Sequence, residues 1–264
     1  MLETNPFSAL AEIVSPLAMQ GFIIAMISLI ALGTIIQMIN HKNLTYFLNN
    51  AKKAKLQATR EISTSERVSI LTKTAVVDIG TTSELGFGKR RLSHVLGMYG
   101  TIIFWVSSAM LIFCYTGIEK PSSSIWSMLW HIGAILTCVG GYWFWFFLRV
   151  DVLAEAHPWY RIIKADLFVL ALLACSTFGL AWSYTQYSGN VGLSFLFLTL
   201  FVTSNLVLFG GVYWSKFAHM FYKPGAAIQK NLAEADGSRD NLPPLADAPK
   251  QFGLGIKREE PKHY

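Results

Sequence analysis

Two histidines stand at the ends of apolar segments that run in opposite directions if both cross a membrane. His94 opens the apolar run after Lys89-Arg90-Arg91, and His219 follows the last apolar run, so both imidazoles would lie at the same depth. Neutral imidazoles from two different helices are suitable axial ligands for a b-type haem in a helical bundle. The placement predicts one haem near one membrane face. Two interfacial histidines that bind no cofactor are the alternative.

Four further residues are candidates for a quinone site. Tyr99, Trp105, Trp130 and His131 carry polar-tipped or aromatic side chains within apolar runs, although packing and anchoring at the interface would also explain them. His131 lies toward the face opposite His94, where no second histidine completes a haem. We therefore expect it to form a hydrogen bond to a neighbouring helix or to a quinone-site carbonyl.

The cysteines argue against an iron–sulfur centre within this chain. Cys114, Cys138 and Cys175 each lie in a separate apolar run, and no CxxC motif occurs. An iron–sulfur cluster needs several thiolates placed together. Phosphate-binding glycine loops and nucleophile elbows are absent from the sequence as well. Any redox chemistry must therefore come from a bound cofactor or from a partner.

Five apolar runs must position these residues. They cover 17–38, 95–118, 126–148, 167–185 and 193–214, each close to the ~20 residues that span ~30 Å of hydrocarbon. Threaded in order, they leave 21 of the 22 Lys and Arg residues on one side and only Lys120 on the other. The positive-inside rule then predicts an outer N-terminus and a cytoplasmic C-terminus. We predict an all-α integral membrane protein, a five-helix transmembrane bundle, in a bacterial cytoplasmic membrane.

Composition supports the membrane class and argues against a nucleic-acid partner. Apolar residues make up 53% of the chain, charged residues only 14%, and the mean hydropathy is +0.40. The net charge of +6 comes from basic residues that flank apolar runs and alternate with acids, as expected beside anionic lipid. The first 16 residues contain no Lys or Arg, so we expect the first run to stay as an anchor.

The segments outside the spans differ in character. Leu44, Phe47 and Leu48 have helical spacing, so the basic loop is expected to form one or two amphipathic surface helices. From Pro224 onward, Pro, Gly and polar residues predict a largely extended arm. The predicted organisation is an outer segment 1–16 along the interface, a first transmembrane helix 17–38, a basic cytoplasmic loop 39–93, a four-helix transmembrane unit 94–222 and an extended cytoplasmic tail 223–264.

Two motifs at the helix ends resemble a known membrane family. They read Arg90-Arg91-Leu92-Ser93-His94 followed by Tyr99-Gly100, and Ser215-Lys216-Phe217-Ala218-His219. The pair resembles the five-helix membrane subunits of the nitrate reductase gamma type, especially those of quinone-interacting and heterodisulfide-reductase-like complexes of sulfur metabolism. The resemblance covers roughly residues 70–223. In length and tail, the chain is most similar to the membrane anchors of dissimilatory adenylylsulfate reductase in sulfur-oxidising bacteria.

The resemblance implies an electron-transfer subunit that performs no catalysis itself. It implies two partners, quinone and a soluble iron–sulfur flavoprotein, here adenylylsulfate reductase. It also implies that His94 and His219 would hold one haem b near the cytoplasm. Two-haem members place two further histidines where this chain has Phe104 and Phe201, so a two-haem relay is not expected.

The cytoplasmic surface carries an excess of basic residues, most of it in the first loop. Partner docking is therefore expected to be electrostatic, and we predict that Lys52, Lys53 and Lys55 take part. Two other functions stay open: a structural anchor without cofactor and a small secondary transporter. A transporter would favour charged residues inside the helices, and the apolar runs contain no Asp, Glu, Lys or Arg.

Overall fold

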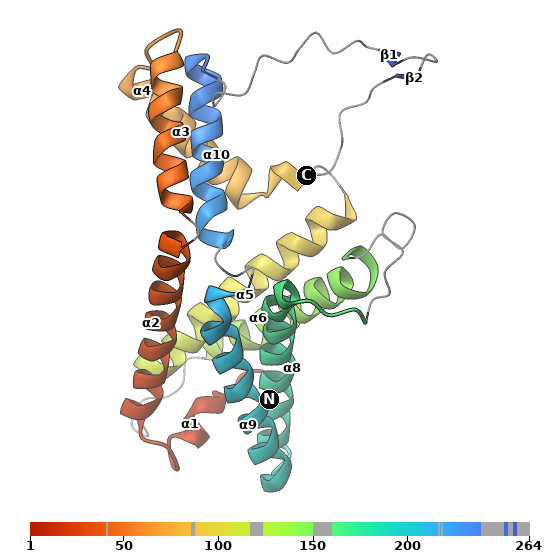
Figure 1. Ribbon diagram of the computed structural model, residues 1–264. Coiled ribbons are helices and arrows are strands. Elements are labelled where there is room, and N and C mark those ends of the chain that lie inside the picture. Colours follow the sequence, from red (N-terminus) through yellow and green to blue (C-terminus); the bar gives the residue numbers. More distant parts are fainter. Residues whose placement is uncertain are drawn as a thin grey trace. The chain divides into compact units, whose positions relative to one another are not determined.

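The chain folds into two compact units (Figure 1). One unit comprises Met1–Ile36 and Leu92–Ala218, and the other comprises Gln37–Arg91 and His219–Tyr264. The computed structural model describes residues 1–40, 42–85, 88–116, 124–149, 160–215, 217, 219–238, 251–252 and 256–257.

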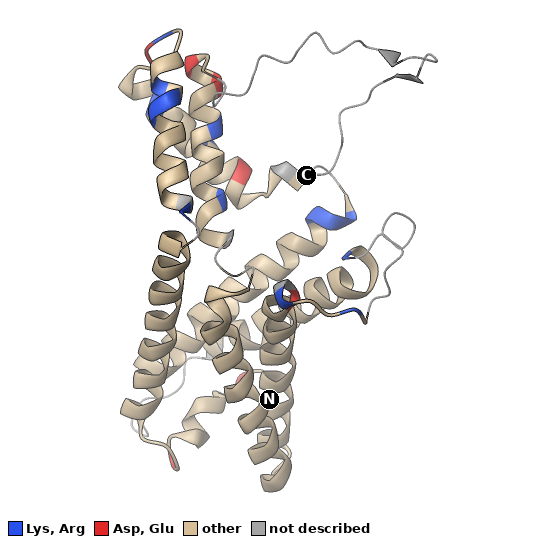
Figure 2. Cartoon of the chain, in the orientation of Figure 1, with Lys and Arg blue, Asp and Glu red and all other residues tan. Residues whose placement is uncertain are grey.

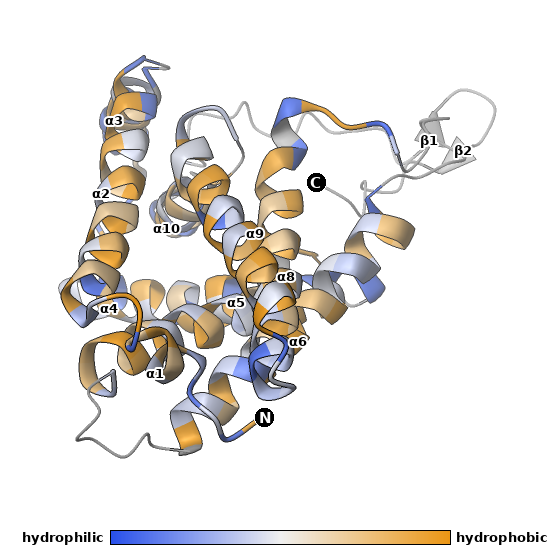
Figure 3. Cartoon of the chain, turned by 90° about the horizontal axis from the view of Figure 1, so that it is seen from below, coloured by the Kyte–Doolittle hydropathy of each residue, from blue (hydrophilic) through white to orange (hydrophobic). Residues whose placement is uncertain are grey.

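Five helices of the described chain are long and apolar enough to cross a membrane, which confirms the number expected from hydropathy. They are α2 (Pro16–Asn40), α5 (Lys89–Cys114), α6 (Ser124–Trp143) with a π-helical continuation (Phe144–Leu148), α8 (Leu167–Tyr187), and α9 (Val191–Gly210) with a 3-10 turn (Gly211–Tyr213). Hydrophobic residues recur along them in Figure 3. α5 begins at Lys89 rather than at residue 95, because Lys and Arg are good helix formers and the apolar run marks the lipid boundary only.

Small residues bring the backbones of α5 and α6 together in the first unit. A Cβ atom at Gly100 would lie 2.5 Å from the Thr137 amide nitrogen, and one at Gly140 would lie 2.6 Å from the Ser93 carbonyl oxygen. Ser93 Oγ also donates a hydrogen bond to the Gly140 carbonyl at 2.8 Å. Glycine is required at both positions because the two helices approach so closely.

Aromatic rings fill the interior of the first unit. Phe104 on α5, Trp130 on α6, Trp182 on α8 and Phe201 on α9 are buried and form a chain of ring contacts. Rings from four helices therefore close the centre of the bundle, in agreement with the dense packing of protein interiors.

The N-terminal segment also belongs to this aromatic core. Phe7, in the short helix α1 (Pro6–Leu10), lies edge-on to Trp130 and Trp182, with ring centroids 5.9 and 5.5 Å apart. Asn5 accepts a hydrogen bond from the Phe7 N–H and donates one to the Tyr115 carbonyl. The Phe7 ring therefore buries its apolar surface inside the bundle. The position of this segment along the membrane interface stays a prediction.

An ion pair links the end of the α6 continuation to the turn before α8. Arg149 pairs with Asp166, donates to the Arg161 carbonyl at 2.6 Å and lies 4.1 Å over the Trp145 ring. Asp166 ends the 3-10 turn (Lys164–Asp166) that precedes α8. The two charged side chains are largely buried, so each needs the other as its partner.

The second unit is a group of helices from the first loop and the tail. The loop forms α3 (Asn43–Gln57), α4 (Thr64–Lys73), a π-helical segment (Thr74–Gly80) and a 3-10 turn (Ser83–Leu85), which confirms the helices expected there. α10 (His219–Asp236) packs against α3, α4 and the π-helical segment. Two short strands, β1 (Gln251–Phe252) and β2 (Ile256–Lys257), pair antiparallel.

The extended conformation expected from residue 223 is wrong as far as Asp236. The sequence AAIQKNLAEAD, from Ala226 to Asp236, consists mostly of strong helix formers, and Ala227 and Ala233 are buried against the loop helices. Pro224 is accommodated inside the helix. The helix ends where Gly237 adopts a φ of +80°, a left-handed conformation that glycine adopts without strain.

Candidate redox and docking sites

The two histidines predicted to bind haem belong to different units. His94 lies near the start of α5 with an exposed side chain, and His219 is the first residue of α10. The His219 side chain is outside the described part of the structure, so their pairing stays a prediction. Among the residues that are described, no three His, Cys, Asp or Glu side chains are grouped to hold a metal ion.

Phe104 and Phe201, which the resemblance places at the positions of further histidines in two-haem subunits, lie in contact in the aromatic core. Their ring centroids are 6.4 Å apart, with the planes at 72°. Trp130 packs on Phe104, and Trp182 packs on Phe201. Phenyl rings therefore occupy both positions, and they provide no ligand atom for a haem iron.

His131 is buried, and both of its ring nitrogens are engaged. Nδ1 lies 2.7 Å from the Ser127 carbonyl oxygen, and Nε2 lies 2.7 Å from Ser183 Oγ on α8. A carbonyl only accepts, so Nδ1 carries the proton and, in the neutral ring, Nε2 accepts from the serine hydroxyl. His131 thus joins α6 to a neighbouring helix, which confirms the hydrogen bond expected from the sequence.

Trp130 and Tyr99 have very different surroundings. Trp130 is fully buried in the aromatic core, and its Nε1–H donates to Ser108 Oγ on α5 at 2.9 Å. Tyr99 has 43% of its surface exposed on α5. Of the four predicted quinone-site residues, Trp130 therefore lies inside the bundle and Tyr99 lies at its surface.

Trp105 is the fourth of these residues, and its hydrogen bonding differs from that of Trp130. Its Nε1–H is buried, yet it finds no hydrogen-bond partner in the described chain. The indole ring packs against Phe209, near the end of α9, with centroids 5.3 Å apart, and against Phe217 at 6.0 Å. Trp105 therefore combines aromatic neighbours with an unused donor.

The lysines predicted to dock a partner all lie on one helix of the second unit. Lys52, Lys53 and Lys55 on α3 have exposed side chains, and none forms an ion pair with a described residue. Ala54, between them, is buried. Figure 2 shows charged residues on α3, α4 and α10, whereas the long helices are almost without them. This group of helices, 37–91 with 219–238, is called the basic platform below.

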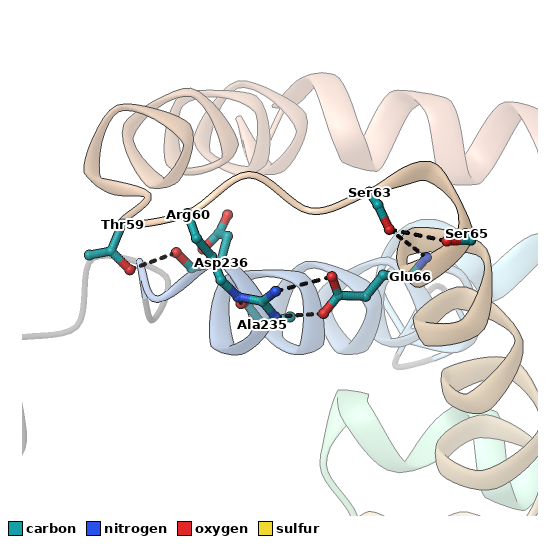
Figure 4. A network of polar contacts seen from close by, with 7 residues as sticks. All are labelled: Thr59, Arg60, Ser63, Ser65, Glu66, Ala235 and Asp236. Atoms are coloured by element: carbon teal, nitrogen blue, oxygen red, sulfur yellow. Dashed lines mark hydrogen bonds and ion pairs between the residues drawn. The ribbon is translucent and has the colours of Figure 1, made fainter.

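Polar contacts between loop and tail hold the basic platform together (Figure 4). Arg60, between α3 and α4, donates to the Ala235 carbonyl at 2.5 Å and to both carboxylate oxygens of Glu66 at 2.5 and 3.1 Å. The Thr59 N–H donates to the Asp236 carbonyl at 2.9 Å. These carbonyls end α10, where the helix dipole favours a cation.

A further contact joins α10 to the π-helical segment, and the contact from Arg60 shifts the pKa of Glu66. The Asn231 amide donates to Thr74 Oγ1 and to Asp78 Oδ2, each at 2.7 Å. The hydrogen bond from Arg60 lowers the pKa of the Glu66 carboxyl below its usual value. Sequence reasoning missed these residues, since Arg60 and Ala235 are 175 positions apart and no local pattern links them. The run of helix formers before Gly237 was the available signal for α10.

One groove lies in the first unit, at α1, α8 and α9. It has a volume of about 210 Å³ and is lined by Leu10, Trp182 and Leu198 together with the polar side chains of Gln186 and Asn190. None of the residues predicted from the sequence to form a site lines this groove.

Comparison with protein-family models, with curated proteins and with solved structures finds no match for this chain. Its function is therefore inferred from its own residues and their geometry.

Proposed function

We propose that this chain is a non-catalytic membrane subunit that docks a soluble iron–sulfur flavoprotein and exchanges its electrons with membrane quinone. By resemblance, the partner is adenylylsulfate reductase of sulfur metabolism. The supporting observation is that loop and tail fold together into a basic platform, with ten basic and four acidic residues in 37–91. Such a surface attracts an acidic protein over several ångströms and orients it on approach.

The histidine pair gives this proposal its redox element. His94 is exposed near the start of α5, and His131 is excluded as a ligand because hydrogen bonds engage both of its ring nitrogens. Haem held by His94 and His219 would supply one-electron transfer near the cytoplasmic face. The apolar bundle gives quinone, which is dissolved in lipid, access to this electron path.

The proposal requires the basic platform to face the cytoplasm of a bacterial cell. The five spans and the asymmetry of Lys and Arg support an outer N-terminus and an inner C-terminus. Reporter fusions at Asn50 and Gly253 should report the cytoplasm, and a fusion at Ser123 should report the outside. A periplasmic signal from Gly253 would contradict this orientation.

Docking is tested by reversing charge on α3. The Lys52→Glu, Lys53→Glu, Lys55→Glu triple variant should bind purified adenylylsulfate reductase more weakly than wild type, above all at low ionic strength, where screening is weakest. A matched control reverses Arg67, Lys73 and Lys230, which are also exposed on the platform, with the same change in net charge. Equal loss in both variants would mean that overall charge acts and that α3 is not the docking site.

A structural anchor without cofactor is the second candidate. The observation that favours it is the aromatic core, in which Phe104 and Phe201 pack ring against ring and provide no ligand atom. In that case the platform would hold the partner at the membrane, and electrons would reach quinone directly from the partner. A reduced-minus-oxidised visible spectrum of the purified chain separates the two candidates.

A further inference from the structure

The groove at α1, α8 and α9 has no role in the proposed function. All of its lining residues belong to the first unit: Ala9, Leu10 and Ile13 come from α1 and the residues after it, and the others come from the end of α8 and the first half of α9. Its volume of about 210 Å³ is open space, unlike the aromatic core, whose rings are packed together. A groove of this kind beside two membrane helices can hold a small apolar or amphipathic molecule.

Apolar side chains form the inner part of the groove and continue onto the surface of the bundle. Trp182 is 1% exposed and packs on Phe7 of α1, with ring centroids 5.5 Å apart. Ile13, Val191 and Phe195 also line the groove, and each has more than half of its surface exposed. Val191 and Phe195 lie on α9, a helix long and apolar enough to cross the membrane. The groove is therefore continuous with surface that contacts lipid.

Polar groups lie where α8 ends and α9 begins. Asn190 Oδ1 accepts a hydrogen bond from the Leu193 N–H at 3.1 Å and so caps α9, whereas the Asn190 amide NH₂ donates to no described residue. The hydroxyl of Ser194, one turn along α9, forms no hydrogen bond with a described residue either. Asn190 is exposed and Ser194 is half-buried, so a ligand in the groove can reach both groups.

The depth of these donors in the membrane limits the choice of ligand. Since α8 and α9 are both candidate spans, the turn that joins them lies at a membrane face, in the interfacial layer that holds the ester carbonyls of phospholipids. Leu198, which also lines the groove, is eight residues beyond Asn190 and therefore about 12 Å further along α9. The groove thus combines donors at the interface with an apolar wall that extends into the hydrocarbon.

We propose that this groove binds one phospholipid, with an ester carbonyl at the Asn190 amide and the Ser194 hydroxyl and an acyl chain along Trp182 and Leu198. An ester oxygen only accepts, which matches the two unused donors. The acyl chain covers apolar surface that the protein leaves open, and it contacts α1 and α9 at once. The bound lipid therefore helps to hold the N-terminal helix against the bundle.

The test measures phospholipid binding to the full chain by native mass spectrometry, with palmitoyl-oleoyl-phosphatidylethanolamine added to protein purified in mild detergent. Wild type should bind one lipid in preference to further ones. Ser194→Phe fills the groove and removes the hydroxyl, so the dissociation constant should rise by about tenfold or more. Thr199→Phe is the matched control, because Thr199 is an exposed polar residue on the same helix outside the groove, and it should bind like wild type.

A second variant keeps the structure of the turn. Asn190→Asp retains the oxygen that caps α9 and replaces the amide donor by a carboxylate, so its dissociation constant should rise by about fivefold to tenfold. Thermal unfolding of each variant checks that the bundle is intact.

Three outcomes would overturn the proposed lipid site. Wild type that binds no lipid in preference would exclude it, and equal affinity of wild type, Ser194→Phe and Asn190→Asp would place the lipid elsewhere. Displacement of the lipid by an equimolar short-tailed ubiquinone analogue would assign the groove to quinone instead. The lipid site does not rest on the proposed docking and haem, which involve other residues, so its failure would leave them standing.

Discussion

His94 and His131 lie in very different surroundings. His131 is sealed in the bundle, and its two hydrogen bonds leave no nitrogen lone pair for iron. His94 is exposed near the start of α5, beside the basic residues that precede the span. At the scale of single residues, His131 is therefore a link between helices, whereas ligation by His94 is part of the proposed function.

The haem prediction follows from this division. If the chain binds one b-type haem, His94→Ala and His219→Ala should each abolish the reduced-state absorption band, whereas His131→Ala should leave it intact. The measurement is the reduced-minus-oxidised spectrum of each variant, with membrane insertion checked by immunoblot. Loss of the band in His131→Ala would mean that the wrong histidines were paired.

Glu66 gives a residue-scale prediction for pH. Its pKa in the folded platform is lowered by the hydrogen bond from Arg60, so the pair stabilises the fold fully above the ordinary carboxyl pKa of about 4.3. The contribution is lost as pH falls through the lowered pKa. Thermal unfolding between about pH 6 and pH 3 should thus show a decline that is shallower in Glu66→Gln. Glu61→Gln, in the same exposed loop, is the control, and identical slopes for all three proteins would remove the pair from the account.

Among the elements, the contact of α5 with α6 depends most on residue size. Gly100→Ala should destabilise the bundle by about 1–3 kcal/mol, because the new methyl group meets the backbone of α6. Gly97→Ala, on the same helix, meets nothing within 4 Å and should be neutral or slightly stabilising. Unfolding midpoints in detergent compare the two. Equal stability of both variants would show that the helices pack less closely than described.

Sequence patterns predicted some elements better than others, for physical reasons. Hydropathy identified all five membrane helices, because a span must be continuously apolar. α10 was missed because Pro224 and Gly225 suggested a break, while the packing of Ala227 and Ala233 against the loop helices depends on contacts far apart in the sequence.

The same limit applies to the candidate site. The sequence predicted Trp105 and Trp130 as quinone-site residues on the same ground, their aromatic side chains, because hydropathy and residue type do not distinguish them. Only tertiary packing shows that Ser108 satisfies one indole, whereas the other lies buried against Phe209 without an acceptor in the described chain. The contacts between Arg60 and the tail could not be predicted from local sequence patterns for the same reason.

At the scale of the whole molecule, the first unit contains most of the apolar spans, and the second unit contains most of the charged residues. The long helices contain no ionisable Asp, Glu, Lys or Arg within their apolar runs, whereas loop and tail carry most of the charge. The proposed function requires both a folded basic unit and an apolar bundle, because the subunit would receive electrons from a soluble protein and pass them to quinone in lipid.

The most direct test of this account is coupled electron transfer in inside-out membrane vesicles. Purified adenylylsulfate reductase is added with sulfite and AMP, and the conversion of quinone to quinol, which takes up two electrons and two protons, is followed by absorbance. Vesicles that contain the chain should form quinol faster than vesicles without it, and the Lys52→Glu, Lys53→Glu, Lys55→Glu variant should lose most of this gain at low salt. Equal rates with and without the chain would contradict the account.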